Sequence, residues 1–311
     1  MNVLFVSSGN STFGISPIVH NQGMSLLEKN VKVEFYTIKG KGLWGYIKNI
    51  PDLRKKIKSD SFDIIHAHYS LSAFLVTLSL PKIPIIVSLM GSDSKSSPIF
   101  KLLIGIFNKF FWSAIIVKSK DMSHSLNLKA AHIIPNGINL SFFVLKEKKK
   151  IREQLGLDVN KKYVLFPANP NRYEKNYTLA LDAMKKLEKS NIELLTIYNQ
   201  KQEIILDYMS AADVLLSTSL WEGSPNAIKE AMSINLPVVS THVGDVPWLF
   251  ENCEGYFLTS SDVEDVTSKL RLALMTDNSQ IKGREQIIRL GLDSQQIAEK
   301  IKSIYVQAIS E

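Results

Sequence analysis

Cysteine is almost absent from this 311-residue sequence, and the single Cys253 cannot form an intramolecular disulfide or a thiolate metal cluster. A cysteine-poor chain is typical of a reducing compartment, so we expect a cytoplasmic location. An unbroken apolar run of about 20 residues, which a membrane-crossing helix needs, is also missing because Lys82, Lys101 and Lys109 interrupt the longest runs. The first ten residues lack the basic start and long apolar stretch of an export signal. These absences predict a protein that is neither exported nor inserted across a bilayer.

Low-complexity tracts are absent too, and hydrophobic residues at 45% and charged residues at 22% are ordinary values for a globular protein. This composition excludes bulk disorder and fibrous classes. The length is about twice that of a typical domain, which favours two domains with separate cores.

Charge is divided unevenly between the two halves of the chain. Residues 1–150 contain 20 Lys and Arg against 8 Asp and Glu, whereas residues 151–311 contain 17 against 22. A basic amino-terminal half indicates an anionic partner. Because no nucleic-acid-binding motif is present and the lysines are spread over many segments, an anionic membrane surface or acceptor is favoured over nucleic acid.

Two series of short apolar runs, each alternating with longer amphipathic segments, predict two parallel α/β sheets. The predicted strands are 2–7, 31–37, 62–68, 84–89 and 113–119, and then 163–168, 192–198, 213–219, 237–242 and 255–259. A loop and basic patch at 133–150 separates the series, and residues 293–310 show a helical pattern with one apolar face. We therefore expect an α/β protein with two doubly wound, Rossmann-like domains facing across a cleft: residues 1–140, residues 141–292, and a closing helix at 293–311.

The segment 217–247 carries the clearest site signal. After the strand at 213–219 comes a WEGSP turn, in which Ser224 is expected as N-cap and Pro225 as the first residue of a helix running to about Ser233. The start of that helix is a site for an anion such as phosphate. Two carboxylates, Glu222 and Glu230, are suited to accept hydrogen bonds from hydroxyl groups. A sugar nucleotide contains both a phosphate and hydroxyl groups, so it is a ligand that fits this segment.

Glu222 and Glu230 form an E-x7-E pattern, and EGSPNAIKEAM resembles the donor-binding motif of retaining glycosyltransferases with the GT-B fold. The segments IIPNGIN (133–139), VSSGNSTFGISPIV (6–19) and FDIIHAH (62–68) resemble other segments of that family, in the same order. By this resemblance, Glu230 binds the ribose hydroxyls and Glu222 contacts the donor sugar or the reacting centre. The backbone of the following segment holds the sugar and phosphate: Gly223, Ser224, Pro225, Asn226, Ala227 and Ile228.

Arg172 and Lys175 follow the strand at 163–168 and offer positive charge to a diphosphate leaving group, in place of a metal ion. The family is metal-independent, so no cofactor or metal is expected. The family usually has four residues between its arginine and a Lys-Gly pair, whereas two residues intervene here and Asn176 replaces the glycine. Exposed loop charges are the alternative interpretation.

Three further features stand in the amino-terminal half. Gly14 is a candidate contact of the donor diphosphate or an ordinary turn glycine. His66 and His68 share one face of a strand and are either acceptor-side residues or packed or solvent-facing histidines. Asp93 is an acceptor-side candidate, but Met90 occupies a position where many relatives have histidine, which argues against a general-base role.

The apolar, aromatic segment 99–112, with Lys101 and Lys109, predicts either a helix buried against the sheet or a contact with an anionic membrane. The expected activity is retaining hexosyl transfer from a nucleotide donor, most simply a UDP-sugar, to a hydroxyl of a glycan or polyprenyl-linked acceptor, in cell-surface polysaccharide or glycolipid biosynthesis. The alternatives are a sugar-nucleotide epimerase of the same fold and an inactive donor-binding partner subunit.

Overall fold

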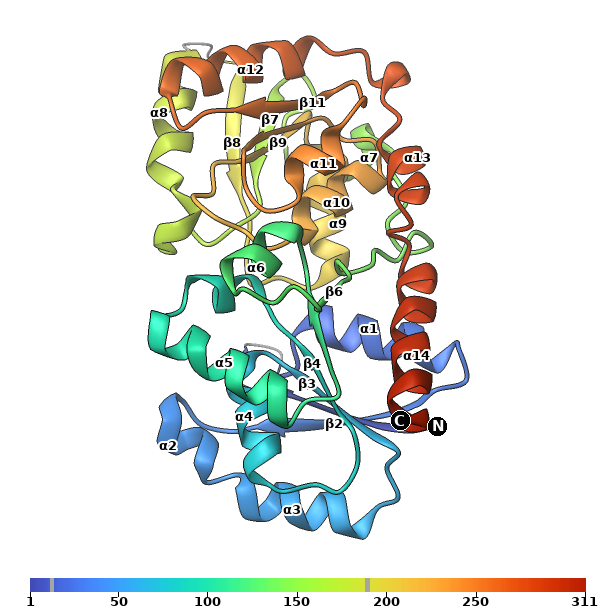
Figure 1. Cartoon of the computed structure of the whole chain (residues 1–311). Coiled ribbons are helices and arrows are strands. Elements are labelled where there is room, and N and C mark those ends of the chain that lie inside the picture. Colours follow the sequence, from blue (N-terminus) through green and yellow to red (C-terminus); the bar gives the residue numbers. More distant parts are fainter. Residues whose placement is uncertain (12–13, 188–190) are drawn as a thin grey trace. The chain divides into compact units, whose positions relative to one another are not determined.

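A computed structural model describes residues 1–11, 14–187 and 191–311; of the predicted glycine-containing loop 6–19, Thr12 and Phe13 therefore lie outside the described residues. The chain divides into two compact units, residues 1–137 with 293–311 (unit 1) and residues 138–292 (unit 2) (Figure 1). The sequence placed these divisions after residues 140 and 292.

Unit 1 is built on a sheet in the order β2-β1-β3-β4-β5-β6, and each of its described strand pairings is parallel. All five residues of β3 are buried, because helices cover both faces of the sheet. The strands are β1 (Asn2–Ser8), β2 (Lys32–Ile38), β3 (Ile64–His68), β4 (Ile85–Ser88), β5 (Ala114–Val117) and β6 (His132–Ile133). The helices are α1 (Pro17–Leu27), α2 (Gly42–Ile47), α3 (Ile50–Ser59), α4 (Ser70–Leu78), η1 (Gly91–Lys95), α5 (Pro98–Phe110), α6 (Lys120–Ser125) and α14 (Ser294–Ser310).

The carboxyl-terminal helix α14 belongs to unit 1, where it packs against α1. Lys302 on α14 donates through Nζ to the carbonyl of Lys29 at 3.0 Å, just beyond the end of α1. Gly137 permits a close approach, since a Cβ atom there would lie 2.7 Å from the Cα atom of Ser294. The helix thus completes unit 1 although 155 residues of unit 2 precede it in the chain.

Unit 2 repeats the architecture with the strand order β11-β10-β9-β7-β8, again parallel in each described pairing. Its strands are β7 (Lys162–Phe166), β8 (Ile192–Thr196), β9 (Val214–Ser217), β10 (Val238–Thr241) and β11 (Tyr256–Thr259). Its helices are α7 (Lys148–Gln154), η2 (Tyr173–Lys175), α8 (Tyr177–Leu187), α9 (Gln202–Ala211), α10 (Asn226–Ser233), α11 (Val246–Phe250), α12 (Val263–Met275), η3 (Asn278–Gln280) and α13 (Gly283–Arg289). The predicted fold class, two doubly wound α/β domains, is confirmed.

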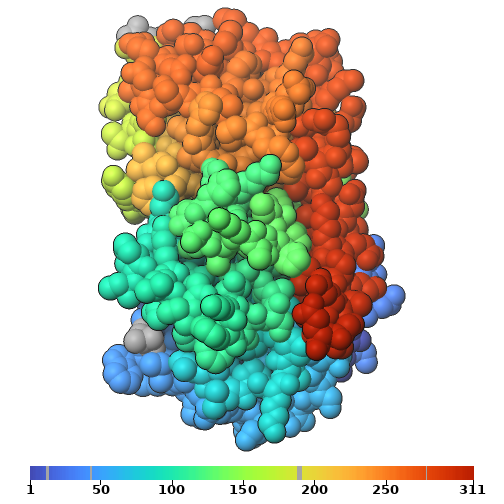
Figure 2. Space-filling model, viewed as in Figure 1, coloured from blue at the N-terminus to red at the C-terminus, as the bar shows by residue number. Residues whose placement is uncertain are grey.

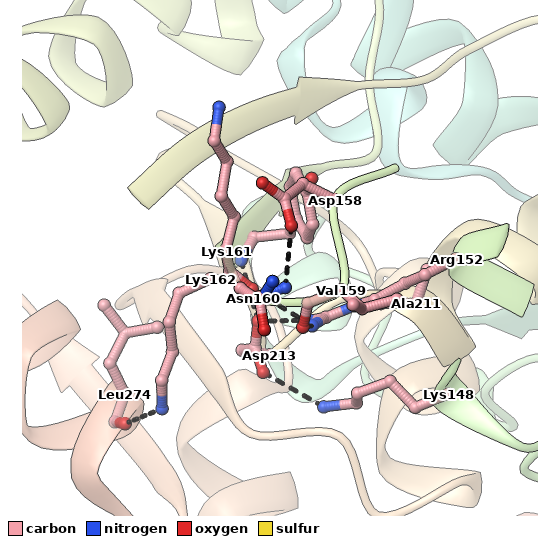
Figure 3. A network of polar contacts seen from close by, with 11 residues as sticks. Lys148, Arg152, Asp158, Val159, Asn160, Lys161, Lys162, Ala211, Asp213 and Leu274 are labelled. Atoms are coloured by element: carbon pink, nitrogen blue, oxygen red, sulfur yellow. Dashed lines mark hydrogen bonds and ion pairs between the residues drawn. The ribbon is translucent and has the colours of Figure 1, made fainter. Parts of the chain in front are cut away.

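A buried ion pair anchors α7 to the amino-terminal edge of the unit 2 sheet (Figure 3). Arg152 donates to Asp213 at 2.7 Å and to the backbone carbonyls of Val159, Lys161 and Ala211. Asp213 also accepts from the backbone N–H of Tyr163 at 2.7 Å. Because these buried polar groups form hydrogen bonds with one another, helix α7 is held against the sheet. The opposite, carboxyl-terminal edge of the sheet is where such folds bind ligands.

Candidate functional site

An ion pair between Lys175 and Glu222 lies at the carboxyl-terminal edge of the unit 2 sheet. Lys175 ends η2 in the loop after β7, and Glu222 lies in the turn after β9. The hydroxyl of Ser219 donates to the same carboxylate at 2.9 Å. Both charged side chains are less than one-fifth exposed. The structure therefore brings together two of the residues that the sequence predicted to be catalytic.

Hydrogen bonds to backbone carbonyls join the two loops that carry this pair. Thr218 donates through Oγ1 to the carbonyls of Lys175 and Asn176, at 3.0 and 2.9 Å. The backbone N–H of Leu220 donates to the carbonyl of Glu174 at 2.8 Å. Because neighbouring strands β7 and β9 position both loops, the ammonium and the carboxylate are held on a rigid base.

The helix α10 begins at Asn226, directly after the turn that contains Glu222. The predicted N-cap is wrong: Pro225 occupies the cap position, and no side chain caps the helix. The Ser224 hydroxyl instead accepts a hydrogen bond from Nζ of Lys229 at 2.9 Å, one turn into the helix. The first N–H groups of a helix have no acceptor within that helix, so the backbone around Ala227 is suited to an anion.

Burial shifts the pKa values of two neighbouring residues on α10 toward each other. Desolvation raises the pKa of Glu230 to about 7, although the nearby Lys229 ammonium opposes the shift. Desolvation also lowers the pKa of Lys229 to about 8, against the opposing attraction of Asp245 and Glu230. Glu230 is therefore poised between its neutral and charged forms near neutral pH, as is common for groups in binding and catalytic sites.

The WEGSP turn packs directly on the loop after β10. Gly244 has a φ of +54°, and a Cβ atom there would lie 2.5 Å from the carbonyl oxygen of Gly223. The hydroxyl of Thr241, the last residue of β10, donates to the carbonyl of Ser219 at 2.6 Å. The segment after β9 is thus supported by contacts from β10 and the loop after it, as well as by the loop after β7.

Arg172 does not join this cluster. Its guanidinium pairs with Glu174 in the same loop, and its side chain is 58% exposed. This geometry matches the alternative interpretation of an exposed loop charge.

Gly14 lies in unit 1 and exchanges two hydrogen bonds with Ser11: its backbone N–H donates to the Ser11 carbonyl at 3.0 Å, and its carbonyl accepts from the Ser11 hydroxyl at 2.5 Å. Its φ of +73° is one that glycine adopts without strain. This backbone conformation accounts for glycine at the position, and a contact with a donor diphosphate stays a prediction.

His66 and His68 are both buried inside unit 1, and their rings stack with centroids 4.3 Å apart. His66 uses both ring nitrogens internally: Nδ1 lies 2.5 Å from the Tyr305 hydroxyl on α14, and Nε2 lies 2.8 Å from the Ser88 hydroxyl. Burial, followed by the charge of Lys118, lowers the pKa of His68 well below its usual value. His66 thus links the sheet to α14, which matches the packed-histidine interpretation, and the acceptor-side roles of His66 and His68 stay predictions.

Asp93 is buried at the start of η1 and joins two segments of unit 1. One carboxylate oxygen accepts from the Ser70 hydroxyl at 2.5 Å, and the other accepts from the backbone N–H of Met90 at 2.7 Å. Burial raises its pKa to about 6, although these bonds favour the charged form. The geometry fits a residue that positions the loop after β4.

Within residues 1–11, 14–187 and 191–311, no cluster of three or more His, Cys, Asp or Glu side chains has a geometry that suits a metal ion. Metal independence stays a prediction.

The sequence did not indicate Lys229, Ser219 and Thr218. Ser219 bonds to the Glu222 carboxylate, Thr218 to the backbone carbonyl of Lys175, and Lys229 to the Ser224 hydroxyl. A signal for Lys229 was available, since it adjoins Glu230 and lies between the inward-facing Ile228 and Met232. Thr218 and Ser219 carry no such signal, because hydroxyl residues are common after strands.

Two family models match this chain in succession. Residues 18–142 match the model described as Glycosyltransferase Family 4, and residues 180–276 match Glycosyl transferases group 1, a range that includes Glu222 and Glu230. The chain is a group 1 glycosyltransferase.

Two curated glycosyltransferases resemble this enzyme. TuaC of Bacillus subtilis (strain 168), whose name places it in teichuronic acid biosynthesis, is 29% identical over 60% of this chain. That alignment spans 55% of the length of TuaC. The UDP-Gal:alpha-D-GlcNAc-diphosphoundecaprenol alpha-1,3-galactosyltransferase of Escherichia coli is 24% identical, over 85% of this chain and 80% of that protein.

Solved structures show the same GT-B fold at low identity. The sucrose-phosphate synthase tll1590 of Thermosynechococcus elongatus superposes with a TM-score of 0.84 at 15% identity, over 99% of both chains. The Anabaena protein Alr3699/HepE, in complex with UDP and glucose, superposes with a TM-score of 0.78 at 16% identity, over 99% of this chain and all of the other. The enzyme therefore has a GT-B fold made of two Rossmann-like domains.

Proposed function

We propose that this glycosyltransferase transfers a sugar from a UDP-sugar, held by unit 2, to a hydroxyl group of a glycan or lipid-linked acceptor, with retention of configuration. The observation that carries the proposal is the Lys175–Glu222 pair beside the start of α10 and the buried Glu230. A diphosphate, a sugar and a ribose each have a chemically matched partner in this cluster.

Each residue has a separate task in the proposed donor site. Glu230 accepts hydrogen bonds from the ribose hydroxyls, and the backbone N–H groups of Gly223, Ser224 and residues 226–228 hold the phosphate and sugar. Lys175 has three donor hydrogens, so its ammonium can contact a phosphate oxygen while it remains bonded to Glu222. Glu222 in turn orients Lys175 and accepts a bond from the donor sugar.

In the reaction, the acceptor oxygen bonds to the anomeric carbon as the bond from that carbon to the diphosphate oxygen breaks. The proton of the acceptor hydroxyl passes to the departing phosphate. Charge that develops on the diphosphate is stabilised by Lys175 and by the α10 amides, which are already in place before the reaction.

The choice of UDP and of a lipid-linked acceptor is supported by the relatives. The name of the Escherichia coli enzyme specifies UDP-Gal and a diphosphoundecaprenol acceptor, and the Anabaena structure contains UDP. The basic amino-terminal half adds support, because a diphosphate-linked acceptor and its membrane are both anionic. We accordingly propose a peripheral location on the inner face of the membrane. No helix of the described residues is long and apolar enough to span a bilayer.

The proposal is tested by incubating the enzyme with individual UDP-sugars and a panel of lipid-linked and free glycan acceptors. We expect one donor to yield a glycoside whose anomeric configuration, determined by NMR, equals that of the donor. An inverted product would refute retention. Conversion of the UDP-sugar without an acceptor would identify an epimerase instead.

A further inference from the structure

Helix α5 exposes a continuous apolar face to solvent. Ile99, Leu102, Leu103, Ile106 and Phe110 recur at intervals of one, three or four residues, so they share one side of the helix. Ile99, Leu102 and Phe110 are each more than 60% exposed, and Phe111, which follows the helix, is also exposed. Single exposed apolar residues are ordinary, but a contiguous row of them marks an interaction surface.

The opposite side of α5 is firmly packed on unit 1. Ile104 is fully buried, and the rings of Phe100 and Phe107 contact Phe74 on α4 with centroids 5.3 and 4.7 Å away. Trp112, just past the helix, donates through its indole N–H to Thr77 at 2.9 Å. One side of segment 99–112 thus packs in the core, as the buried-helix interpretation predicts, and the other side faces outward.

Basic residues predominate around this face. From Ser94 to Lys120 the sequence contains five lysines, of which Lys118 is buried, and no Asp or Glu; Lys109 is exposed beside Phe110. The segment 39–58, which includes α2 and α3, has seven Lys and Arg against one acidic residue. Figures 1 and 2 show α5 (teal) and α2 (blue) toward the same side of unit 1, and both helices pack on α4.

We propose that the outer face of α5 docks on an anionic lipid bilayer, inserting its apolar side chains between headgroups while the surrounding lysines contact the phosphates. An apolar strip bordered mainly by cations complements such a surface in both respects. Trp44 on α2 is 75% exposed, and tryptophan is enriched at membrane interfaces. This inference deepens the proposed function, since a membrane-borne acceptor requires an enzyme held at the surface.

The test measures sedimentation of the intact protein with vesicles, and it involves no turnover. Vesicles of phosphatidylcholine with phosphatidylglycerol are compared with phosphatidylcholine alone, at low and at high salt. The test variant is Leu102→Ser/Ile106→Ser, at two exposed positions one turn apart. The matched control is Leu272→Ser/Met275→Ser, at two exposed apolar positions of α12 in unit 2. Thermal melting of each variant verifies folding.

We expect the wild type and the control to bind phosphatidylglycerol vesicles, most strongly at low salt. The α5 variant is expected to bind at least about tenfold more weakly, because it lacks two apolar side chains whose transfer from water into the bilayer favours binding. Equal binding by the wild type and the α5 variant would overturn the inference. So would self-association of the wild type that the α5 variant abolishes, which would identify a second copy as the occupant. A UDP-induced rise in melting temperature, unchanged in the α5 variant, separates failure of docking from failure of the donor site.

Discussion

Lys175 and Glu222 form an ion pair although 47 positions separate them in the sequence. The pair depends on the parallel neighbours β7 and β9, whose carboxyl ends lie side by side. A lysine in one loop and a glutamate in another thereby become a single functional group.

Replacement of Lys175 tests whether this group stabilises the leaving diphosphate. We expect Lys175→Met to lower kcat by about 10²- to 10³-fold, because a preorganised charge opposite the departing phosphate is removed. Lys161→Met is the matched control, since Lys161 also pairs with a glutamate of unit 2, Glu193, at the other end of β7. Steady-state kinetics with a saturating donor measure the effect. Equal kcat values for the two variants would exclude the proposed role.

Binding of a UDP-sugar is expected to strengthen with rising pH. Burial raises the pKa of Glu230 to about 7, so its carboxyl group is mostly neutral at pH 6 and mostly charged at pH 8. Hydroxyl groups donate more strongly to the charged form, so affinity follows ionisation and rises about tenfold between these pH values. A UDP-sugar suits the measurement because its diphosphate, esterified at both ends, does not titrate in this range.

Isothermal titration calorimetry on the wild type and on Glu230→Gln checks this pH dependence. The variant is expected to bind weakly and with little change between pH 6 and 8. A wild-type affinity that falls with pH, or that changes equally in the variant, would show that another group controls binding.

Substitution of Gly244 tests the support beneath the WEGSP turn. A Cβ atom at this position would meet the backbone oxygens of Gly223 and Glu222, at 2.5 and 3.0 Å, so we expect Gly244→Ala to displace the turn and weaken UDP binding. Gly156→Ala is the control, because Gly156 also has a positive φ but its Cβ atom would meet nothing within 4 Å.

Both glycine variants are expected to lose about 1 kcal/mol of unfolding free energy from backbone strain alone. Only Gly244→Ala should lose more than this and bind UDP more weakly. Urea denaturation and calorimetry measure the two quantities, and identical behaviour of the variants would contradict the proposed support.

The fold was predictable because its signal is repeated along the chain. Ten apolar runs spaced by amphipathic segments correspond to β1–β5 and β7–β11. The two-residue β6 was missed, since His132–Ile133 is too short and too exposed to produce a pattern. The α/β class needs only local periodicity, whereas the placement of α14 depends on contacts of Tyr305 and Lys302 with residues more than 200 positions away.

The sequence could predict the site residues that form a recognisable motif. It could not predict contacts that depend on which side chains are buried together. The sequence drew attention to Glu222, Glu230 and Lys175, but it assigned a cap to Ser224 that the structure gives to Pro225. It also could not show that His66 bonds to Tyr305, because this contact arises only from tertiary packing. The local sequence cannot distinguish a strand histidine that faces a ligand from one that packs against a helix.

Thermal unfolding with UDP, GDP and ADP tests most directly whether unit 2 binds a uridine diphosphate through α10. A ligand that binds only the folded state raises the melting temperature. We expect UDP to raise the melting temperature of the wild type and of Glu203→Gln, an exposed control on α9, and to have little effect on Glu230→Gln. An equal shift in all three proteins, or no shift with any nucleotide, would contradict the proposed donor site.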